Sequence, residues 1–242
     1  MSRKWYKYFL FVILTAGCKK TVMVNDIIEL QITNKQIIAD GASIDTIYGH
    51  IPINAIATNR EILFKTSTGL FQNNADTISI SANLTNIQNN KITAAAILTS
   101  SLRIGLDTII AYTYSVPQYS DSATINLTPS LPDSISLESS SFLVQPGYQS
   151  DVTITGQLFS KTGGMVSQGY KVLFNDFYKD HTPVNGSYMD PQNISNNLSQ
   201  VSVVYSPGLV ADSTFMYISG TVVDSMNVPL AKPDTIQLFI SQ

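Results

Sequence analysis

Few side chains in this chain are of the types that carry out acid–base or covalent chemistry. The chain has 242 residues, with one cysteine, Cys18, and two histidines, His50 and His181. Catalysis by histidine requires a second reacting group within hydrogen-bond reach. A predicted domain boundary separates the two histidines, so we do not expect them to share a site.

Common catalytic and metal-binding motifs are missing. The chain has no His-Glu-x-x-His, no Cys-x-x-Cys and no phosphate-binding glycine loop. The nearest approach to a nucleophile elbow is Gly164-Met165-Val166-Ser167-Gln168-Gly169, where the spacing is wrong by one residue and a hairpin is predicted. A paired-carboxylate glycosidase stays open, because two acids need only meet in space. The acids lie mostly in predicted turns, however, and we predict a non-enzyme without catalytic residues, metal or cofactor.

A calcium site is a weaker alternative. Asp176, Asp180 and Asp190 lie close together in the sequence, and calcium is held by such oxygen ligands. None of the three fits the spacing of an EF-hand loop, and aspartates are also common turn residues. We therefore interpret them as turn residues.

The first eighteen residues have the order of a secretory signal peptide. Arg3, Lys4 and Lys7 give a positive start, and an apolar stretch follows from Tyr8 to Ala16. This stretch is too short to cross a bilayer, which takes about 20 apolar residues. The small residues that follow lead directly to Cys18.

This arrangement resembles a bacterial lipoprotein signal. The corresponding lipobox is Leu14-Thr15-Ala16-Gly17-Cys18, with leucine one position earlier than usual, a form similar to that of Bacteroidetes-like bacteria. The resemblance implies that residues 1–17 are removed, that Cys18 is acylated with fatty acids such as palmitate, and that 18–25 is a lipidated tether. An ordinary signal peptide with an incidental cysteine is the alternative.

Composition predicts a folded, strand-rich body. Hydrophobic residues make up 44% of the chain and charged residues 13%, which argues against a disordered chain. The net charge is −3 and no basic run lies beyond the N-terminus, so nucleic acid is not an expected partner. If Cys18 carries lipid, the mature chain has no disulfide. Abundant Ser, Thr, Asn, Ile and Val favour strands and turns.

Alternating apolar and polar residues predict two successive sets of strands. The first set lies in 26–128 and the second in 134–242, joined by a proline-rich linker at 129–133. The predicted strands of the first set are Ile27–Ile32, Ile44–Ile51, Arg60–Thr66, Ile78–Leu84, Thr93–Ser100, Thr108–Tyr114 and Ser122–Thr128. Those of the second set are Ser134–Glu138, Ser150–Ser160, Tyr170–Asn175, Ser199–Tyr205, Thr214–Val223 and Asp234–Ile240. Short strands at this spacing predict antiparallel β-sandwiches.

Several segments of the first set resemble the bacterial Ig-like domains of intimin and invasin (the Big family). They are Ala39-Asp40-Gly41, Phe64-Lys65-Thr66-Ser67-Thr68-Gly69, and the series Ala94, Ala96, Leu98, Ser100, Gly105 and Ile110-Ala111. We predict that Gly41 and Gly69 occupy turns with positive φ. The resemblance implies an all-β chain of two tandem immunoglobulin-like sandwiches, acting as an extracellular spacer or adhesion module.

One segment of the second set breaks the alternation. The stretch Asn175–Leu198 is predicted to be a long loop, and such loops in a sandwich are either functional or mobile. Its aromatic residues Phe177, Tyr178, His181 and Tyr188 are candidates for a binding surface. Alternatively, they cover the open end of the core.

Two further patterns leave alternatives open. Tyr112, Tyr114 and Tyr119 could stack on sugars, which would suit a glycan-binding accessory lipoprotein of a nutrient-uptake system. Asp-Thr-Ile begins at four positions, Asp45, Asp76, Asp107 and Asp234, with the related Asp-Ser-Ala at Asp121 and Asp-Ser-Ile at Asp133. The tripeptide is similar to the O-glycosylation site of Bacteroides-like periplasmic proteins, but turn and strand propensities predict it equally well.

Together these patterns predict a non-enzymatic protein anchored by lipid to the outer membrane, in the cell envelope, facing either the periplasm or the medium. Its expected partners are the membrane and a protein or glycan ligand, with adhesion, interaction or spacing as its role.

Overall fold

The computed structural model describes residues 27–114, 116–147 and 151–241. In these ranges the chain forms strands and one short 3-10 helix, η3 (Ala57–Asn59), which confirms the predicted all-β class. None of the helices in these ranges has the length and apolar character needed to cross a membrane. The predicted signal peptide, Cys18 and the tether lie outside the described residues.

The first sandwich packs two five-stranded sheets face to face. One sheet has the order β1-β3-β8-β5, with β7 also paired to β8, and the other has the order β2-β10-β9-β4-β6. Their bounds are β1 (Glu29–Ile32), β2 (Gln36–Ala39), β3 (Ile44–Pro52), β4 (Glu61–Thr66), β5 (Leu70–Phe71), β6 (Thr77–Ser81), β7 (Asn83–Gln88), β8 (Lys91–Thr99), β9 (Gly105–Thr113) and β10 (Val116–Pro129). Alternate residues of β3 and β8 are buried between the sheets, as the period of two predicts.

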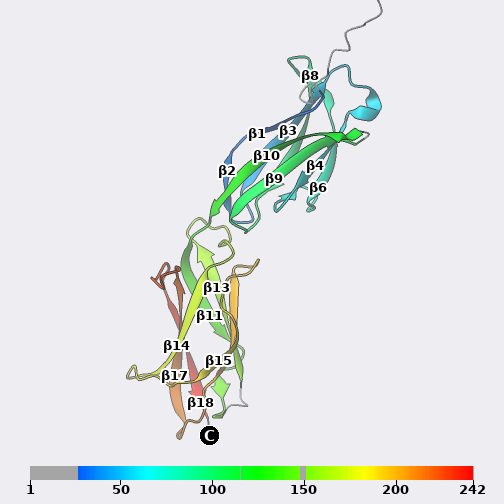
Figure 1. Cartoon of the computed structure of the whole chain (residues 1–242). Coiled ribbons are helices and arrows are strands. Elements are labelled where there is room, and N and C mark those ends of the chain that lie inside the picture. The colour runs from blue at the N-terminus through cyan, green and yellow to red at the C-terminus, as the bar shows by residue number, and fades with distance from the viewer. Residues whose placement is uncertain (1–26, 115, 148–150, 242) are drawn as a thin grey trace, which may run out of the picture.

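The second sandwich has two four-stranded sheets, with the orders β11-β13-β16-β15 and β12-β18-β17-β14. Their bounds are β11 (Pro132–Ser139), β12 (Leu143–Val144), β13 (Val152–Ser160), β14 (Lys171–Tyr178), β15 (Ser187–Gln192), β16 (Gln200–Ser206), β17 (Thr214–Val223) and β18 (Asp234–Ile240). The sandwiches lie end to end, so the first and last described residues are at opposite ends of an elongated molecule (Figure 1).

The predicted long loop at Asn175–Leu198 is wrong. Strand β14 extends to Tyr178 and β15 occupies Ser187–Gln192, which divides the segment into two connections, 179–186 before β15 and 193–199 after it. The alternation is hidden because Asp176 takes an inward position, where its Oδ2 accepts hydrogen bonds from the Tyr205 hydroxyl and the Gly186 N–H. A partly buried carboxylate at an inward position resembles a loop residue in sequence.

A second prediction fails at Ile78–Leu84, which is not one strand. The chain changes sheets at Ala82, whose N–H donates to the carbonyl oxygen of Arg60 at 2.8 Å, so β6 and β7 belong to different sheets. The alternation of β6 runs on to Leu84 in the sequence, and the break at Ala82 leaves no turn signal.

A buried carboxylate fixes the turn between β4 and β5. Asp107 is fully buried, and its two oxygens accept hydrogen bonds from the Thr66 hydroxyl and from the N–H groups of Ser67, Thr68 and Gly69. Hydrogen bonds to a charged acceptor are roughly twice as strong as neutral ones. The bonds join the end of β4 to the start of β9, which adjoins it in the sheet.

Glycine is needed at positions 41 and 69 for two different reasons. Gly41 has φ +70°, as predicted. Gly69 is absent from the residues with positive φ, so the prediction for it is wrong. A Cβ there would lie 2.8 Å from the carbonyl oxygen of Thr99 and 2.9 Å from an oxygen of Asp107. The close approach of the Asp107 carboxylate therefore requires glycine.

The recurrent Asp-Thr-Ile tripeptide has a structural explanation in three of its copies. The aspartate and isoleucine share the inward face of a strand, while the threonine points away from the core. The aspartates lie at the ends of the sandwiches, where Asp45 accepts from the N–H of Asn34 and Asp234 from that of Leu137. Asp107 is the most buried example.

Replacing Asp107 with alanine should lower the free energy of unfolding by about 2–4 kcal/mol, because several buried donors would lose their acceptor. Chemical denaturation of the purified chain measures this change. Asp76→Ala is the matched control, since Asp76 begins the same tripeptide but is exposed, and should change stability by no more than about 0.5 kcal/mol. Equal effects of both substitutions on the free energy of unfolding would contradict the stabilising role of the buried Asp107 carboxylate.

Candidate interaction surfaces

The junction between the sandwiches is short and hydrogen-bonded. Strand β10 ends at Pro129 and β11 begins at Pro132, so only Ser130 and Leu131 lie between the strands. Ser130 is 3% exposed, and its N–H donates to the Ser167 hydroxyl at 2.8 Å. The connection is therefore held by side chains as well as by its two prolines.

Ser167 is the central residue of this junction. Its side chain is fully buried, and its hydroxyl donates to the carbonyl oxygen of Ala39 in the first sandwich at 2.7 Å. The same oxygen accepts the bond from Ser130, which leaves the hydroxyl both donating and accepting. In the sequence, Ser167 lies in the segment closest to a nucleophile elbow. In the structure its hydroxyl connects the linker to the first sandwich.

Two backbone hydrogen bonds strengthen the contact. The N–H of Met165 donates to the carbonyl oxygen of Asp40 at 3.2 Å, and that of Gln168 donates to Leu102 at 2.8 Å. The segment 164–168 thus pairs with the near end of the first sandwich at three places. Both sandwiches supply backbone groups, so their relative orientation is constrained.

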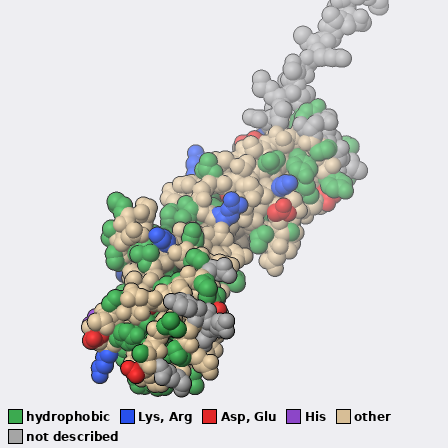
Figure 2. Space-filling model, turned by 60° about the horizontal axis from the view of Figure 1, so that its bottom comes forward, with side chains coloured by type: hydrophobic (Ala, Val, Ile, Leu, Met, Phe, Trp, Pro, Cys, Tyr) green, Lys and Arg blue, Asp and Glu red, His purple; other side chains and the backbone are tan. Residues whose placement is uncertain are grey.

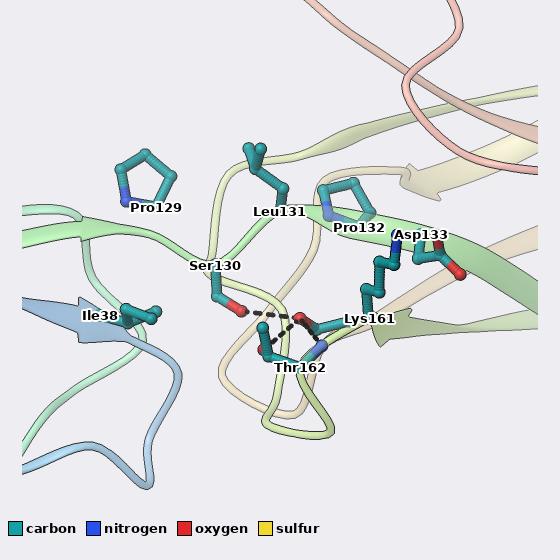
Figure 3. Close-up of a pocket in the computed structure, with 9 residues that line it drawn as sticks. Ile38, Pro129, Ser130, Leu131, Pro132, Asp133, Lys161 and Thr162 are labelled. Carbon is teal, nitrogen blue, oxygen red and sulfur yellow. Dashed lines mark hydrogen bonds between the residues drawn. The ribbon is translucent and has the colours of Figure 1, made fainter.

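A groove of about 380 Å³ lies on one side of the junction (Figure 3). Its apolar lining includes Ile38, Leu131 and Pro132, while hydrogen bonds run from Ser130 to Ser160 and between Ser160 and Thr162. Leu131 is 63% exposed although it lies in the linker. Residues 129–133 of the linker line the groove, which makes it part of the junction.

Asp40, whose carbonyl oxygen accepts a hydrogen bond from Met165 at the junction, has a partly buried carboxyl group. Burial alone would raise the pKa of its carboxyl, but hydrogen bonds from the N–H groups of Ala42 and Ser43 and from the Ser43 and Ser100 hydroxyls together lower the pKa below its ordinary value. A carboxyl whose pKa falls on folding stabilises the folded state above its unfolded pKa. That contribution is lost as the pH falls through the folded pKa.

We expect Asp40→Asn to reduce the free energy of unfolding at pH 7. The reduction should be smaller below about pH 4, because the carboxyl of the unfolded chain then takes up a proton while that of the folded chain still resists it. Urea denaturation of both proteins at pH 7 and pH 3 measures the two differences. A difference that is the same at both pH values would show that the charge of Asp40 does not stabilise the fold.

The four aromatic residues predicted as a binding loop lie at the other end of the second sandwich. Phe177 and Tyr178 end strand β14, His181 is in the turn that follows, and Tyr188 is in β15. The structure brings Phe177 and His181 together, with ring centroids 5.5 Å apart and planes 25° apart. Tyr188 instead packs on Tyr205 at the edge of the core, with centroids 5.0 Å apart.

The outer face of the β12-β18-β17-β14 sheet carries further aromatic rings. Phe177 faces Tyr217 across the strands, with centroids 5.8 Å apart and planes 16° apart. Next to them Phe215 faces Phe239, and both Phe142 and Phe215 are about half exposed. We call these six rings, His181, Phe177, Tyr217, Phe215, Phe239 and Phe142, the distal aromatic face. In Figure 2 hydrophobic side chains are spread over the surfaces of both sandwiches, this end included.

Sequence reasoning missed four of these rings: Phe142, Phe215, Tyr217 and Phe239. Phe215, Tyr217 and Phe239 belong to predicted strands, where the alternation assigned them to the outer face as isolated positions. Only the register that sets Phe177 opposite Tyr217 and Phe215 opposite Phe239 joins them into one surface. The two outward aromatic residues of β17, Phe215 and Tyr217, were the available signal.

A pocket of about 480 Å³ adjoins the distal aromatic face. It is lined by the end of β14 and the turn at 179–186, including Phe177, His181 and the side chains of Asn175, Asp176 and Asn185. While Asp176 Oδ2 has two donors, no donor to its Oδ1 is seen in the described part of the chain. The pocket therefore combines ring faces with amide and carboxylate groups that can bind a polar ligand.

Tyr188 lines the pocket, and Tyr205 contacts both Tyr188 and the lining residue Asp176. Burial raises the pKa of Tyr188, and burial together with the hydrogen bond to Asp176 raises that of Tyr205, so both are protonated at neutral pH. The Tyr205 hydroxyl donates to Asp176 at 2.7 Å. The buried Tyr188 hydroxyl has no partner among the described groups. Tyr205 thus holds Asp176 in place from the core side.

Other candidate residues do not assemble into a site. Tyr112, Tyr114 and Tyr119 make no ring contact with one another in the residues that the structure describes, although Tyr114 is 65% exposed. His50 stacks on Tyr48 in the first sandwich, while His181 is in the second. Burial lowers the pKa of His50.

The calcium alternative gains no support from the described side chains. Across the described ranges, no three His, Cys, Asp or Glu side chains lie close enough to hold a metal ion. Asp180 instead accepts hydrogen bonds from the hydroxyl and N–H of Thr182, which lower its pKa. Asp180 is therefore a turn residue here.

Comparison with solved structures supports the fold assignment. No family model matches the sequence, and no curated protein matches it. The adhesin InvE of Yersinia pseudotuberculosis is similar over 91% of this chain, with 14% identity and a TM-score of 0.53. Invasin, a bacterial integrin-binding protein, is similar over 88%, with 13% identity and a TM-score of 0.54.

The likeness shows the fold. Both sandwiches have an immunoglobulin-like fold similar to that of the two adhesins, which confirms the predicted fold class. The chain spans 60% of the InvE structure and 39% of the invasin structure. At these identities, what the two adhesins bind is not transferred to this chain.

Proposed function

We propose that this protein is a non-enzymatic, lipid-anchored protein of the outer membrane that displays a recognition surface away from the membrane. The observation that carries the proposal is the placement of the two ends. The first described residues lie at one end of the elongated molecule, and strands β14, β17 and β18, which carry the distal aromatic face, belong to the sandwich at the other end (Figure 1). An anchor at Cys18 would thus leave the aromatic face free to meet a partner.

The hydrogen-bonded junction supports the same role. A spacer is useful for display when its domains keep a fixed orientation, because a flexible hinge would allow the recognition surface to fold back. Ser167 and its neighbours oppose such bending through buried hydrogen bonds to the first sandwich. The similarity to domains of two bacterial adhesins agrees with an adhesion or interaction module.

The anchor is tested by replacing Cys18 with alanine. The wild-type protein should fractionate with membranes and the variant should become soluble, since the acyl chains supply the membrane affinity. Retention of the variant in the membrane fraction would contradict lipidation at Cys18. Protease treatment of intact cells then distinguishes the two faces of the outer membrane: loss of the body domains places them outside, and protection places them in the periplasm.

Glycan binding is the second candidate function, and the pocket beside Phe177 favours it. Sugar rings have apolar faces that stack on aromatic rings and hydroxyl groups that bind carboxylates and amides. Phe177 and His181 offer the rings, Asp176 an acceptor oxygen, and Asn175 and Asn185 their amides. This is the usual composition of a small-ligand site, with few polar groups among apolar ones.

Phe177→Ala should abolish binding of the full chain to an array of neutral oligosaccharides, because it removes the central ring of the stack. Phe159→Ala is the matched control, since Phe159 is a 49% exposed phenylalanine of β13 in the opposite sheet. The control should bind like the wild type. If the wild-type chain binds none of the oligosaccharides, or if both variants lose binding equally, the glycan function is wrong.

A further inference from the structure

The end of the first sandwich that faces the N-terminus exposes large apolar side chains. Ile56 is 64% exposed, Leu84 47%, Ile87 50% and Tyr114 65%. We call these four residues the proximal apolar patch. Single exposed apolar residues are ordinary on a protein surface, whereas a group of them at one end marks an interaction site.

Backbone hydrogen bonds bring the segments that carry the patch to the same end of the sandwich. The N–H of Ile53 donates to Asn90, and that of Ala82 donates to Arg60, which joins the loop around Ile56 to strand β7. The N–H of Tyr114 donates to Glu61 at 3.0 Å, which adds the tip of the β9–β10 hairpin. The only coil in Figure 1, at the upper end of the first sandwich, belongs to this group.

The chain enters the sandwich at this same end. Strand β1 begins at Glu29, which pairs with His50 near the end of β3 and forms an ion pair with Lys91. The eight residues Lys19–Asp26 separate Cys18 from the first described residue. Even fully extended, they span no more than about 30 Å. An acylated Cys18 would therefore keep the proximal apolar patch close to the bilayer surface.

The chemistry of the patch suits a lipid surface. Aliphatic side chains insert into the boundary between headgroups and acyl chains, and tyrosine favours that boundary because it has an apolar ring and a polar tip. The polar groups beside the patch carry both signs of charge, since Lys91 forms an ion pair with Glu29 and Arg60 Nε donates to the carbonyl oxygen of Ala55. Four side chains alone bind weakly, but the tether raises their effective concentration at the membrane.

We propose that the proximal apolar patch rests on the outer membrane and orients the molecule relative to it. This inference rests on the proposed lipid anchor at Cys18. With the proximal apolar patch in contact with the membrane, the fixed junction would direct the distal aromatic face away from the bilayer. The patch would thus set the direction of display, which a tether alone leaves free.

The test compares amide hydrogen exchange of the full lipidated chain on vesicles of phosphatidylethanolamine and phosphatidylglycerol with that of the Cys18→Ala chain in solution. Exchange in 53–59 and 83–88 should be slower on vesicles. The double variant Ile56→Ser, Ile87→Ser should lose this protection. Leu106→Ser, at the junction end of the same sandwich and 66% exposed, should retain it.

Vesicle flotation separates the two proposals. If the wild-type chain floats with vesicles but shows no protection of these segments, the membrane contact is wrong and the anchor stands. If it does not float, the anchor and the membrane contact both fail. Protection that persists in the double variant would also overturn the role of the patch.

Discussion

The arrangement of the whole molecule depends on a buried hydroxyl group between its two domains. Ser167 Oγ accepts from the linker and donates to the first sandwich, and its side chain is inaccessible to solvent. A buried polar group that loses its partner costs about 1–3 kcal/mol, so bending at the linker would expose or orphan this group. Together with the prolines that flank Ser130, it makes two small sandwiches into one extended unit.

Buried carboxylates have a comparable role within each sandwich. If Cys18 carries lipid, the mature chain has no disulfide, and hydrogen bonds must fix its turns. Asp107, Asp45 and Asp234 each place a carboxylate at a sandwich end, where it accepts backbone N–H groups from an adjacent segment. The strands and turns that result hold the rings of the distal aromatic face in position.

The sequence predicts the fold well because burial alternates with a period of two. Ile47, Gly49 and Ile51 face inward in β3, as the pattern of apolar residues indicates. The prediction fails where an inward position is polar, as at Asp176, and where a strand changes sheets, as at Ala82. Local sequence does not report the distant donors that satisfy Asp176, since Tyr205 is 29 residues away.

The candidate surfaces were only partly predictable for the same reason. Phe177, Tyr178, His181 and Tyr188 were selected as aromatic residues of one segment, but Tyr188 packs on the edge of the core while Phe177 joins Tyr217 on the outer face. Strand register decides which residues become neighbours, and register depends on the whole sandwich. The role of Ser167 was the least predictable from the sequence, because its hydrogen-bond partner Ala39 lies 128 residues earlier in the chain.

The central claim, a fixed orientation of the two sandwiches, is best tested by a distance distribution. Spin labels on cysteines introduced at the exposed positions Thr85 and Lys179, in a Cys18→Ala background, report the separation of the two domains by pulsed electron paramagnetic resonance. A fixed orientation predicts one narrow distribution that broadens when Ser167 is replaced by alanine. A broad distribution in the chain with Ser167 intact would show a flexible hinge and contradict a fixed orientation.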